Sequence, residues 1–145
     1  MSRRTFGLTG GIASGKSTVL QYFDQLGIRT CDTDQLAREV IAPGSAGQLA
    51  LANAIGANYF DQGLLDRAKL RELLFRQHPL RQTVESIIHP LVKKAADIWR
   101  RQPNFAPYQV LASPLLLETY HPDDLDGVII VDVTPETQLR RASDR

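Results

Sequence analysis

Residues 10–17, Gly-Gly-Ile-Ala-Ser-Gly-Lys-Ser, form the pattern with the most specific chemistry in this sequence. Glycines let backbone N–H groups curl around a phosphate, and the N-terminus of a following helix adds a favourable dipole. In this pattern Lys16 reaches the β- and γ-phosphates, and Ser17 offers its hydroxyl to Mg²⁺. The spacing predicts a nucleoside triphosphate site whose contacts are Gly11, Ala13, Ser14, Gly15, Lys16, Ser17 and Thr18.

Two carboxylates, Asp32 and Asp34, follow a predicted strand over residues 28–31. Parallel strands bind ligands at their carboxyl ends, so we expect both side chains near the phosphate loop. One can hold the water shell of Mg²⁺, and the other can accept a proton from an attacking hydroxyl. Helix capping is the structural alternative, because Asp32-x-x-Gln35 resembles a capping box. Asp32 is the first candidate for the metal, and the further candidates are Glu118 and Asp132.

Four basic residues are candidates for contacts with the substrates. Arg38 lies one predicted helical turn after Asp34, where it either pairs with a substrate phosphate or is solvated. Arg141 and Arg145 share one helix face and either clamp the transferred phosphate or form a solvated helix end. His89 precedes Pro90, and it is either a packing residue or a substrate contact.

The hydrophobic pattern predicts the elements that position these residues. Strands are expected at residues 5–9, 28–31, 108–112 and 128–133, and helices occupy much of the remaining chain. A helix begins after Gly15, Asp66 caps another, and Thr134-Pro135 opens the last one. A strand, a helix and a second strand in succession predict a parallel sheet. The fold class is therefore α/β, a P-loop sheet interrupted by a helical insertion at residues 58–103.

Composition describes an ordinary globular protein. The chain has 145 residues, 43% of them hydrophobic and 23% charged, with a net charge of +1. This balance indicates neither a nucleic-acid surface nor a membrane surface, and no run approaches the length of a membrane span. Cys31 is the single cysteine and is expected to be a buried strand residue. We expect a cytoplasmic protein without an internal disulfide.

Several segments together resemble the dephospho-CoA kinase family, in the family's order along the whole chain. They are residues 7–18, 32–38, 65–75, 89–92, 114–118 and 131–141. The resemblance implies that ATP phosphorylates the ribose 3′-hydroxyl of dephospho-CoA, giving coenzyme A and ADP. It also implies that Asp34 aligns with the proposed catalytic base and that the insertion binds CoA. The expected parts are core residues 1–57 and 104–139, the CoA-binding insertion 58–103, and the start of a lid at 140–145.

The sequence departs from the family pattern in two places. Thr33 replaces the usual small residue between the aspartates, and family members continue for several dozen residues past Arg145. We therefore expect these residues alone to be weakly active, with an exposed apolar sheet edge.

Other functions share some of these features. A kinase for another nucleoside or nucleotide would share the phosphate loop and the aspartates, and only the insertion would distinguish it. A GTP-dependent switch needs an Asn-Lys-x-Asp sequence for guanine, which this chain lacks. A non-catalytic scaffold is the third alternative.

Overall fold

The computed structural model describes residues 3–76, 78–114, 116–120 and 122–144. The chain divides into two compact units, one formed by residues 1–33 and 98–145 and the other by residues 34–97. No helix within these described ranges is long and apolar enough to cross a membrane. Each unit has its own hydrophobic core.

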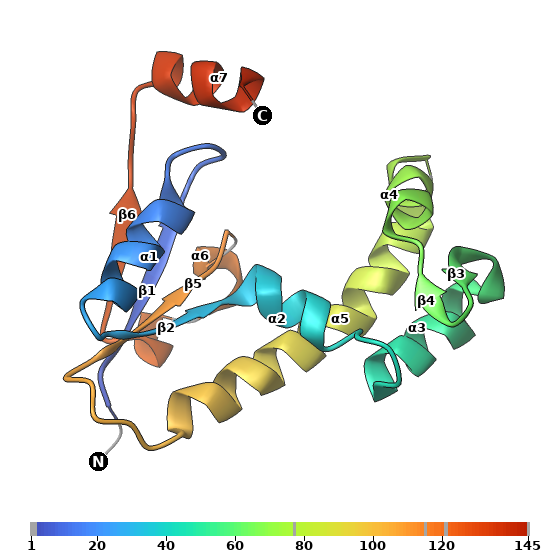
Figure 1. Ribbon diagram of the computed structural model, residues 1–145, viewed down its shortest axis with the longest axis horizontal. Coiled ribbons are helices and arrows are strands. Elements are labelled where there is room, and N and C mark those ends of the chain that lie inside the picture. Colours follow the sequence, from blue (N-terminus) through green and yellow to red (C-terminus); the bar gives the residue numbers. More distant parts are fainter. Residues whose placement is uncertain (1–2, 77, 115, 121, 145) are drawn as a thin grey trace. The chain divides into compact units, whose positions relative to one another are not determined.

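The first unit is built on a four-stranded parallel sheet in the order β2-β5-β1-β6 (Figure 1). The strands are β1 (Thr5–Gly10), β2 (Arg29–Asp32), β5 (Gln109–Ala112) and β6 (Gly127–Val131). The α/β class with a parallel sheet is thus confirmed, and each strand lies within two residues of its predicted bounds. β6 is an edge strand whose Val128 and Ile130 side chains are exposed, as predicted for this edge of the sheet.

Helix α1 (Lys16–Gln25) covers one face of this sheet (Figure 1). Its Val19, Leu20 and Phe23 pack on a buried cluster formed by Leu8, Ile28, Val110 and Ala112. The Cys31 side chain is buried in β2, where its backbone pairs with that of Leu111. Burial of these side chains stabilises the loop between β1 and α1 because both of its ends are fixed.

Three short elements complete the first unit. α6 (Leu116–Thr119) and the 3₁₀ helix η2 (Pro122–Asp124) connect β5 to β6, and α7 (Pro135–Ser143) follows β6. Thr134 caps α7 by accepting a hydrogen bond from the Thr137 N–H at 3.3 Å, and Pro135 occupies the first turn. Both features match the prediction from the sequence.

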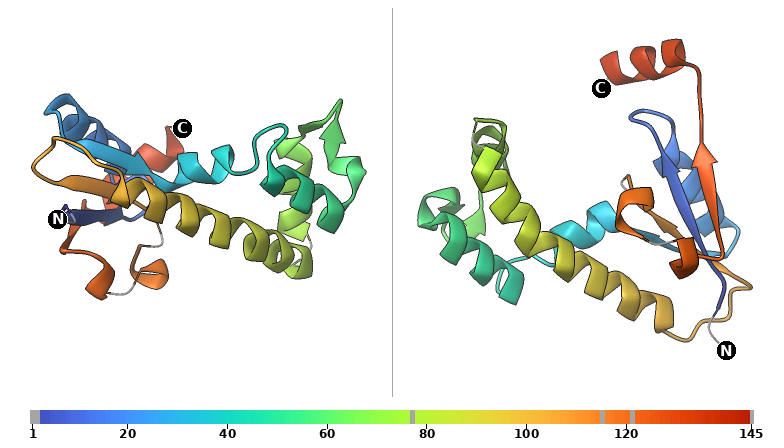
Figure 2. Two further views of the ribbon diagram at one scale, coloured as in Figure 1. Left: turned by 90° about the horizontal axis from the view of Figure 1, so that it is seen from below. Right: turned by 180° about the vertical axis from the view of Figure 1, so that it is seen from behind.

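The second unit contains the helices α2 (Thr33–Glu39), α3 (Ala46–Ile55) and α4 (Arg67–Arg76) (Figure 2). The first residue of α2, Thr33, still belongs to the first unit. Between α3 and α4 lie the 3₁₀ helix η1 (Ala57–Tyr59) and a hairpin formed by β3 (Phe60–Asp61) and β4 (Leu64–Leu65). The core of the second unit is formed by Leu51, Leu70 and Val84. Asp66 caps α4 through the N–H groups of Ala68 and Lys69, as the sequence predicts. Gln62 and Gly63 both have positive φ, which suits a tight two-residue hairpin.

Helix α5 (His78–Arg101) extends through both units as a single helix, with Pro90 inside it. The helix is continuous through Pro90. The last residues of α5 are held in the first unit by Arg29, which donates to the Trp99 carbonyl at 2.7 Å and to the Gln109 side chain at 3.1 Å. Gln109 in turn donates to Thr5 Oγ1 at 2.9 Å and has no exposed surface. This network fixes where the chain leaves α5 and enters the sheet.

Candidate functional site

The loop between β1 and α1 has the geometry of an anion cradle. Ala13 and Gly15 have left-handed φ angles of 59° and 96°, and the Ser14 N–H donates to the Gly11 carbonyl at 3.1 Å. Backbone in which left-handed residues alternate with others turns N–H groups towards one side and forms a concave anion site. No side chain caps α1 at Gly15, so its first turn presents backbone donors to the same space.

Close packing below the loop explains the need for Gly10. A Cβ atom at Gly10 would lie 2.5 Å from Ser14 Oγ and 2.7 Å from the Val131 carbonyl oxygen of the neighbouring strand. Ser14 is 3% exposed, and its hydroxyl has no partner among the residues that the structure describes. A buried hydroxyl without a partner costs free energy, so an anion or water bound in the loop would offset that cost. The residues present thus fit a bound phosphate.

A cavity of about 560 Å³ lies beside this loop. A larger one, of about 750 Å³, lies in another part of the chain. The cavity beside the loop is lined by Ala13, Ser14, Gly15, Thr18, Val19, Val133, Arg141 and Asp144. Five of these eight residues, namely Ala13, Ser14, Gly15, Thr18 and Arg141, are candidates from the sequence. Lys16 and Ser17 are the first two residues of α1, with Lys16 partly buried and Ser17 exposed.

Helix α7 contacts the phosphate loop through two side chains. The Arg141 guanidinium donates from Nη1 to the Ser14 carbonyl at 3.1 Å. The Gln138 side-chain amide donates to the Ile12 carbonyl at 3.1 Å. Arg141 was predicted to act on the transferred phosphate, whereas Gln138 was not named as a site residue. Arg145, its predicted companion, lies outside the described residues.

The predicted acceptor-side residues belong to different parts of the chain. Asp32 is the last residue of β2, and β5 separates that strand from β1. Two strand spacings place β2 about 10 Å from β1. Asp34 and Arg38 are exposed on α2, and His89 is exposed on α5; all three belong to the second unit. Asp34 and Arg38 are one helical turn apart and share a face of α2.

The candidate carboxylates belong to β2, α2 and α6 and to the residue directly after β6. In the described ranges, no three His, Cys, Asp or Glu side chains form a group that could hold a metal ion. The further candidates Glu118 and Asp132 are both exposed, on α6 and directly after β6. A metal ion bound here would also take oxygens of a bound triphosphate and of water as ligands.

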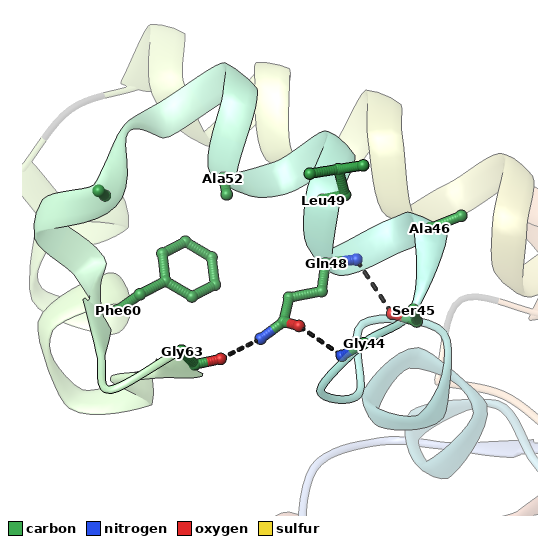
Figure 3. A pocket seen from close by; sticks show the side chains of 9 residues that line it. Gly44, Ser45, Ala46, Gln48, Leu49, Ala52, Phe60 and Gly63 are labelled. Atoms are coloured by element: carbon green, nitrogen blue, oxygen red, sulfur yellow. Dashed lines mark hydrogen bonds between the residues drawn. The ribbon is translucent and has the colours of Figure 1, made fainter.

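The larger cavity, of about 750 Å³, lies within the second unit, between α3 and the β3–β4 hairpin (Figure 3). The Phe60 ring faces this space opposite Ala52, and Leu49 adds apolar surface (Figure 3). The Gln48 amide closes one end, where it accepts from the Gly44 N–H at 2.7 Å and donates to the Gly63 carbonyl at 2.6 Å. The sequence analysis predicted no site here, because the lining residues of α3 and the hairpin form no recognisable motif.

Comparison with known proteins gives one consistent result. The family model described as "Dephospho-CoA kinase" matches residues 4–145. The dephospho-CoA kinase of Hydrogenovibrio crunogenus is 44% identical over 144 residues, which cover 98% of this chain and 73% of that protein. The dephospho-CoA kinase of Escherichia coli K12 is 40% identical over 139 residues, covering 95% of this chain and 67% of the relative.

Solved structures agree with the fold. A crystal structure of a Thermus thermophilus protein superposes with a TM-score of 0.82 at 29% identity, covering 100% of this chain and 73% of the other. The dephospho-CoA kinase from Campylobacter jejuni superposes with a TM-score of 0.67 at 22% identity, covering 97% and 72%, and supports the fold alone. This chain therefore spans about two thirds to three quarters of the length of these proteins.

Proposed function

This chain belongs to the dephospho-CoA kinase family, and on that premise we propose that it transfers the γ-phosphoryl group of ATP to the ribose 3′-hydroxyl of dephospho-CoA. The products are coenzyme A and ADP, and the reaction belongs to coenzyme A synthesis. The observation that carries the proposal is the phosphate loop, whose left-handed Ala13 and Gly15 and uncapped α1 form an anion cradle in a chain that matches the family from residue 4 to residue 145.

On the ATP side, we assign the triphosphate to the cavity beside α1. The backbone of residues 11–15 would hold its phosphates, and Thr18, which also lines the cavity, would lie next to them. Lys16 would place its charge on the β- and γ-phosphates, where negative charge must be stabilised as the phosphoryl group moves. Ser17, at the start of α1, would supply a hydroxyl ligand for Mg²⁺, and Asp32 would order the metal's water shell. When bound, Mg²⁺ supplies charge neutralisation of the phosphates.

On the acceptor side, we assign Asp34 as the general base. Its carboxylate would accept the proton of the 3′-hydroxyl while that oxygen bonds to the γ-phosphorus and the bond to the leaving ADP oxygen breaks. Arg38, one turn along α2, would pair with a phosphate of dephospho-CoA, and His89 on α5 would contact the same substrate. Residues 58–103 would hold the CoA portion. Arg141 is already at the phosphate loop, and it would stabilise the transferred phosphoryl group. A cytoplasmic location stays a prediction.

A comparison of acceptors tests this function. The chain is incubated with ATP and Mg²⁺ and with dephospho-CoA, adenosine or AMP, and ADP formation is followed together with the phosphorylated product. We expect phosphorylation of dephospho-CoA at the 3′-position and little or none of the other two. The Lys16→Ala variant serves as the control for contaminating kinases. Equal or faster turnover of adenosine or AMP would instead support a kinase for another acceptor.

A further inference from the structure

The contact between α7 and the phosphate loop involves two donors and two acceptors in matching order. Gln138 and Arg141 are three residues apart and lie on the same face of α7. Their acceptors, the carbonyls of Ile12 and Ser14, are two residues apart in the loop, and both distances are 3.1 Å. Gln138 thus binds the carbonyl before Ala13 and Arg141 binds the carbonyl after it, so the two contacts lie on either side of this left-handed residue.

Peptide geometry gives this contact a consequence on the opposite side of the loop. In a planar trans peptide unit the C=O and N–H groups point in opposite directions. The Ile12 carbonyl shares its unit with the Ala13 N–H, and the Ser14 carbonyl shares its unit with the Gly15 N–H. When α7 holds both carbonyls, the N–H groups of Ala13 and Gly15 are directed away from α7's donors. These are two donors of the anion cradle.

The helix that carries the two donors is itself well fixed. Thr134 caps it, Pro135 restricts its first turn, and the Gln138 N–H donates to the Thr134 carbonyl at 3.0 Å. Packing against the loop is tight, because a Cβ atom at Gly11 would lie 2.4 Å from Gln138 Nε2. A Cβ atom at Gly15 would lie 3.3 Å from Arg141 Nη1. Glycine at position 11 therefore leaves the space that the Gln138 amide occupies.

We propose that Gln138 is a positioning residue for the triphosphate: with Arg141 it holds the Ile12 and Ser14 carbonyls outward and so orients the Ala13 and Gly15 N–H groups for phosphate. Gln138 acts through the backbone and does not touch the substrate. Arg141 has this role in addition to the one assigned above. The inference rests on the proposed function, because it supposes that the loop binds ATP.

The experiment measures binding, because activity alone would not separate orientation from chemistry. Dissociation constants for ATP with Mg²⁺, for inorganic tripolyphosphate and for dephospho-CoA are measured by calorimetry on the chain and on Gln138→Leu. We expect about fivefold weaker binding of both triphosphate ligands, the scale of one net hydrogen bond. Dephospho-CoA binding should not change. With tripolyphosphate bound, amide exchange at Ala13 and Gly15 should be faster in Gln138→Leu than in the original chain. A loss of overall stability alone would instead speed exchange over the whole sheet.

The adjacent residue supplies a matched control. Leu139 is 70% exposed on the same helix, so Leu139→Gln makes the reverse chemical change without touching the loop contact. It should bind triphosphate as the original chain does. The proposal is overturned if Gln138→Leu retains full affinity for tripolyphosphate, or if Leu139→Gln weakens binding to the same extent.

A second variant approaches the contact from the loop. Gly11→Ala should push the Gln138 amide away, because the new methyl group meets the flexible end of that side chain. Gly11→Ala should weaken tripolyphosphate binding in the original chain but have almost no further effect in the Gln138→Leu variant. This is the result expected when two substitutions remove the same interaction. Fully additive effects would contradict the proposal. If the original chain binds no ATP, or if Lys16→Ala binds it equally well, the proposed function fails instead, which is a different outcome.

Discussion

The Arg29 guanidinium carbon lies 4.5 Å from the centroid of the Trp99 ring, and this stacking joins β2 to the last turn of α5. Burial lowers the pKa of Arg29, and the neighbouring Cys31 opposes that shift. Arg29 also donates to the carbonyl of Trp99 and to the side chain of Gln109. The arginine thus combines a cation–π contact with hydrogen bonds at one place in the fold. The C-terminal end of the long helix α5 is therefore anchored in the first unit.

The buried amide of Gln109 should be costly to remove. It donates to Thr5 Oγ1 and to the Arg100 carbonyl, each at 2.9 Å, and its oxygen accepts from Arg29. Gln109→Leu should lower the free energy of unfolding by about 2–3 kcal/mol, because buried partners are left unpaired. Urea denaturation followed by circular dichroism measures this change. Gln25→Leu, at an exposed position of α1, is the matched control and should change it by less than about 0.5 kcal/mol.

A glycine in α3 should reverse the usual rule for helices. Replacing glycine by alanine within a helix normally stabilises it by about 1 kcal/mol. At Gly47, however, a Cβ atom would lie 2.0 Å from the Val40 carbonyl oxygen, which is backbone and cannot move aside freely. Gly47→Ala should therefore destabilise the chain by about 1–3 kcal/mol in a urea titration. Ala50→Gly, exposed on the same helix, gives the size of the propensity effect alone, and a stabilised Gly47→Ala would contradict this account.

Lys16 is expected to matter most for transfer of the phosphoryl group. Lys16→Ala should lower the turnover of ATP and dephospho-CoA by about a hundredfold or more, the scale of losing one main electrostatic stabiliser. Far-UV circular dichroism checks that the variant folds, since Lys16 is only partly buried. Turnover close to that of the original chain would show that this loop does not hold the reacting phosphates.

The two aspartates should have separable effects. Asp34→Asn keeps the shape of the side chain but cannot accept a proton at neutral pH, so kcat should fall while ATP binding is largely retained. Asp32→Asn should instead raise the Mg²⁺ concentration needed for half-maximal rate. Steady-state kinetics at varied ATP and Mg²⁺ distinguish the two. If the effects are exchanged between the variants, the roles assigned to the aspartates are reversed.

Local patterns in the sequence predicted the phosphate loop and the four strands of the sheet. The loop is a continuous segment of residues 10–17, and its strand and helix follow directly from the residues on either side. The caps at Asp66 and Thr134 were predictable for the same reason, because each acts on residues one turn away. Where structure depends on neighbours in sequence, residue types were sufficient.

Features that depend on distant pairing could not be predicted in this way. The order of the strands places β5 between β1 and β2, so Asp32 is farther from the phosphate loop than succession along the chain suggested. The contact of Gln138 with Ile12 joins residues separated by 126 positions. A glutamine in a helix carries no sign of such a partner. Val133 and Asp144 line the cavity at the loop between β1 and α1 because β6, which precedes them, lies beside β1.

The rate at which a reagent labels the single cysteine measures local opening of the sheet. Cys31 lies in the edge strand β2 and is 8% exposed, and the chain contains no other thiol. A thiol reagent can modify it only after β2 has opened locally, so the labelling rate reports how often that strand separates from β5. β2 continues directly into α2, where the chain passes from the first unit to the second. Slower labelling in the presence of ATP or of dephospho-CoA would therefore show which ligand reduces local opening at this point of the chain. The measurement needs no engineered residue.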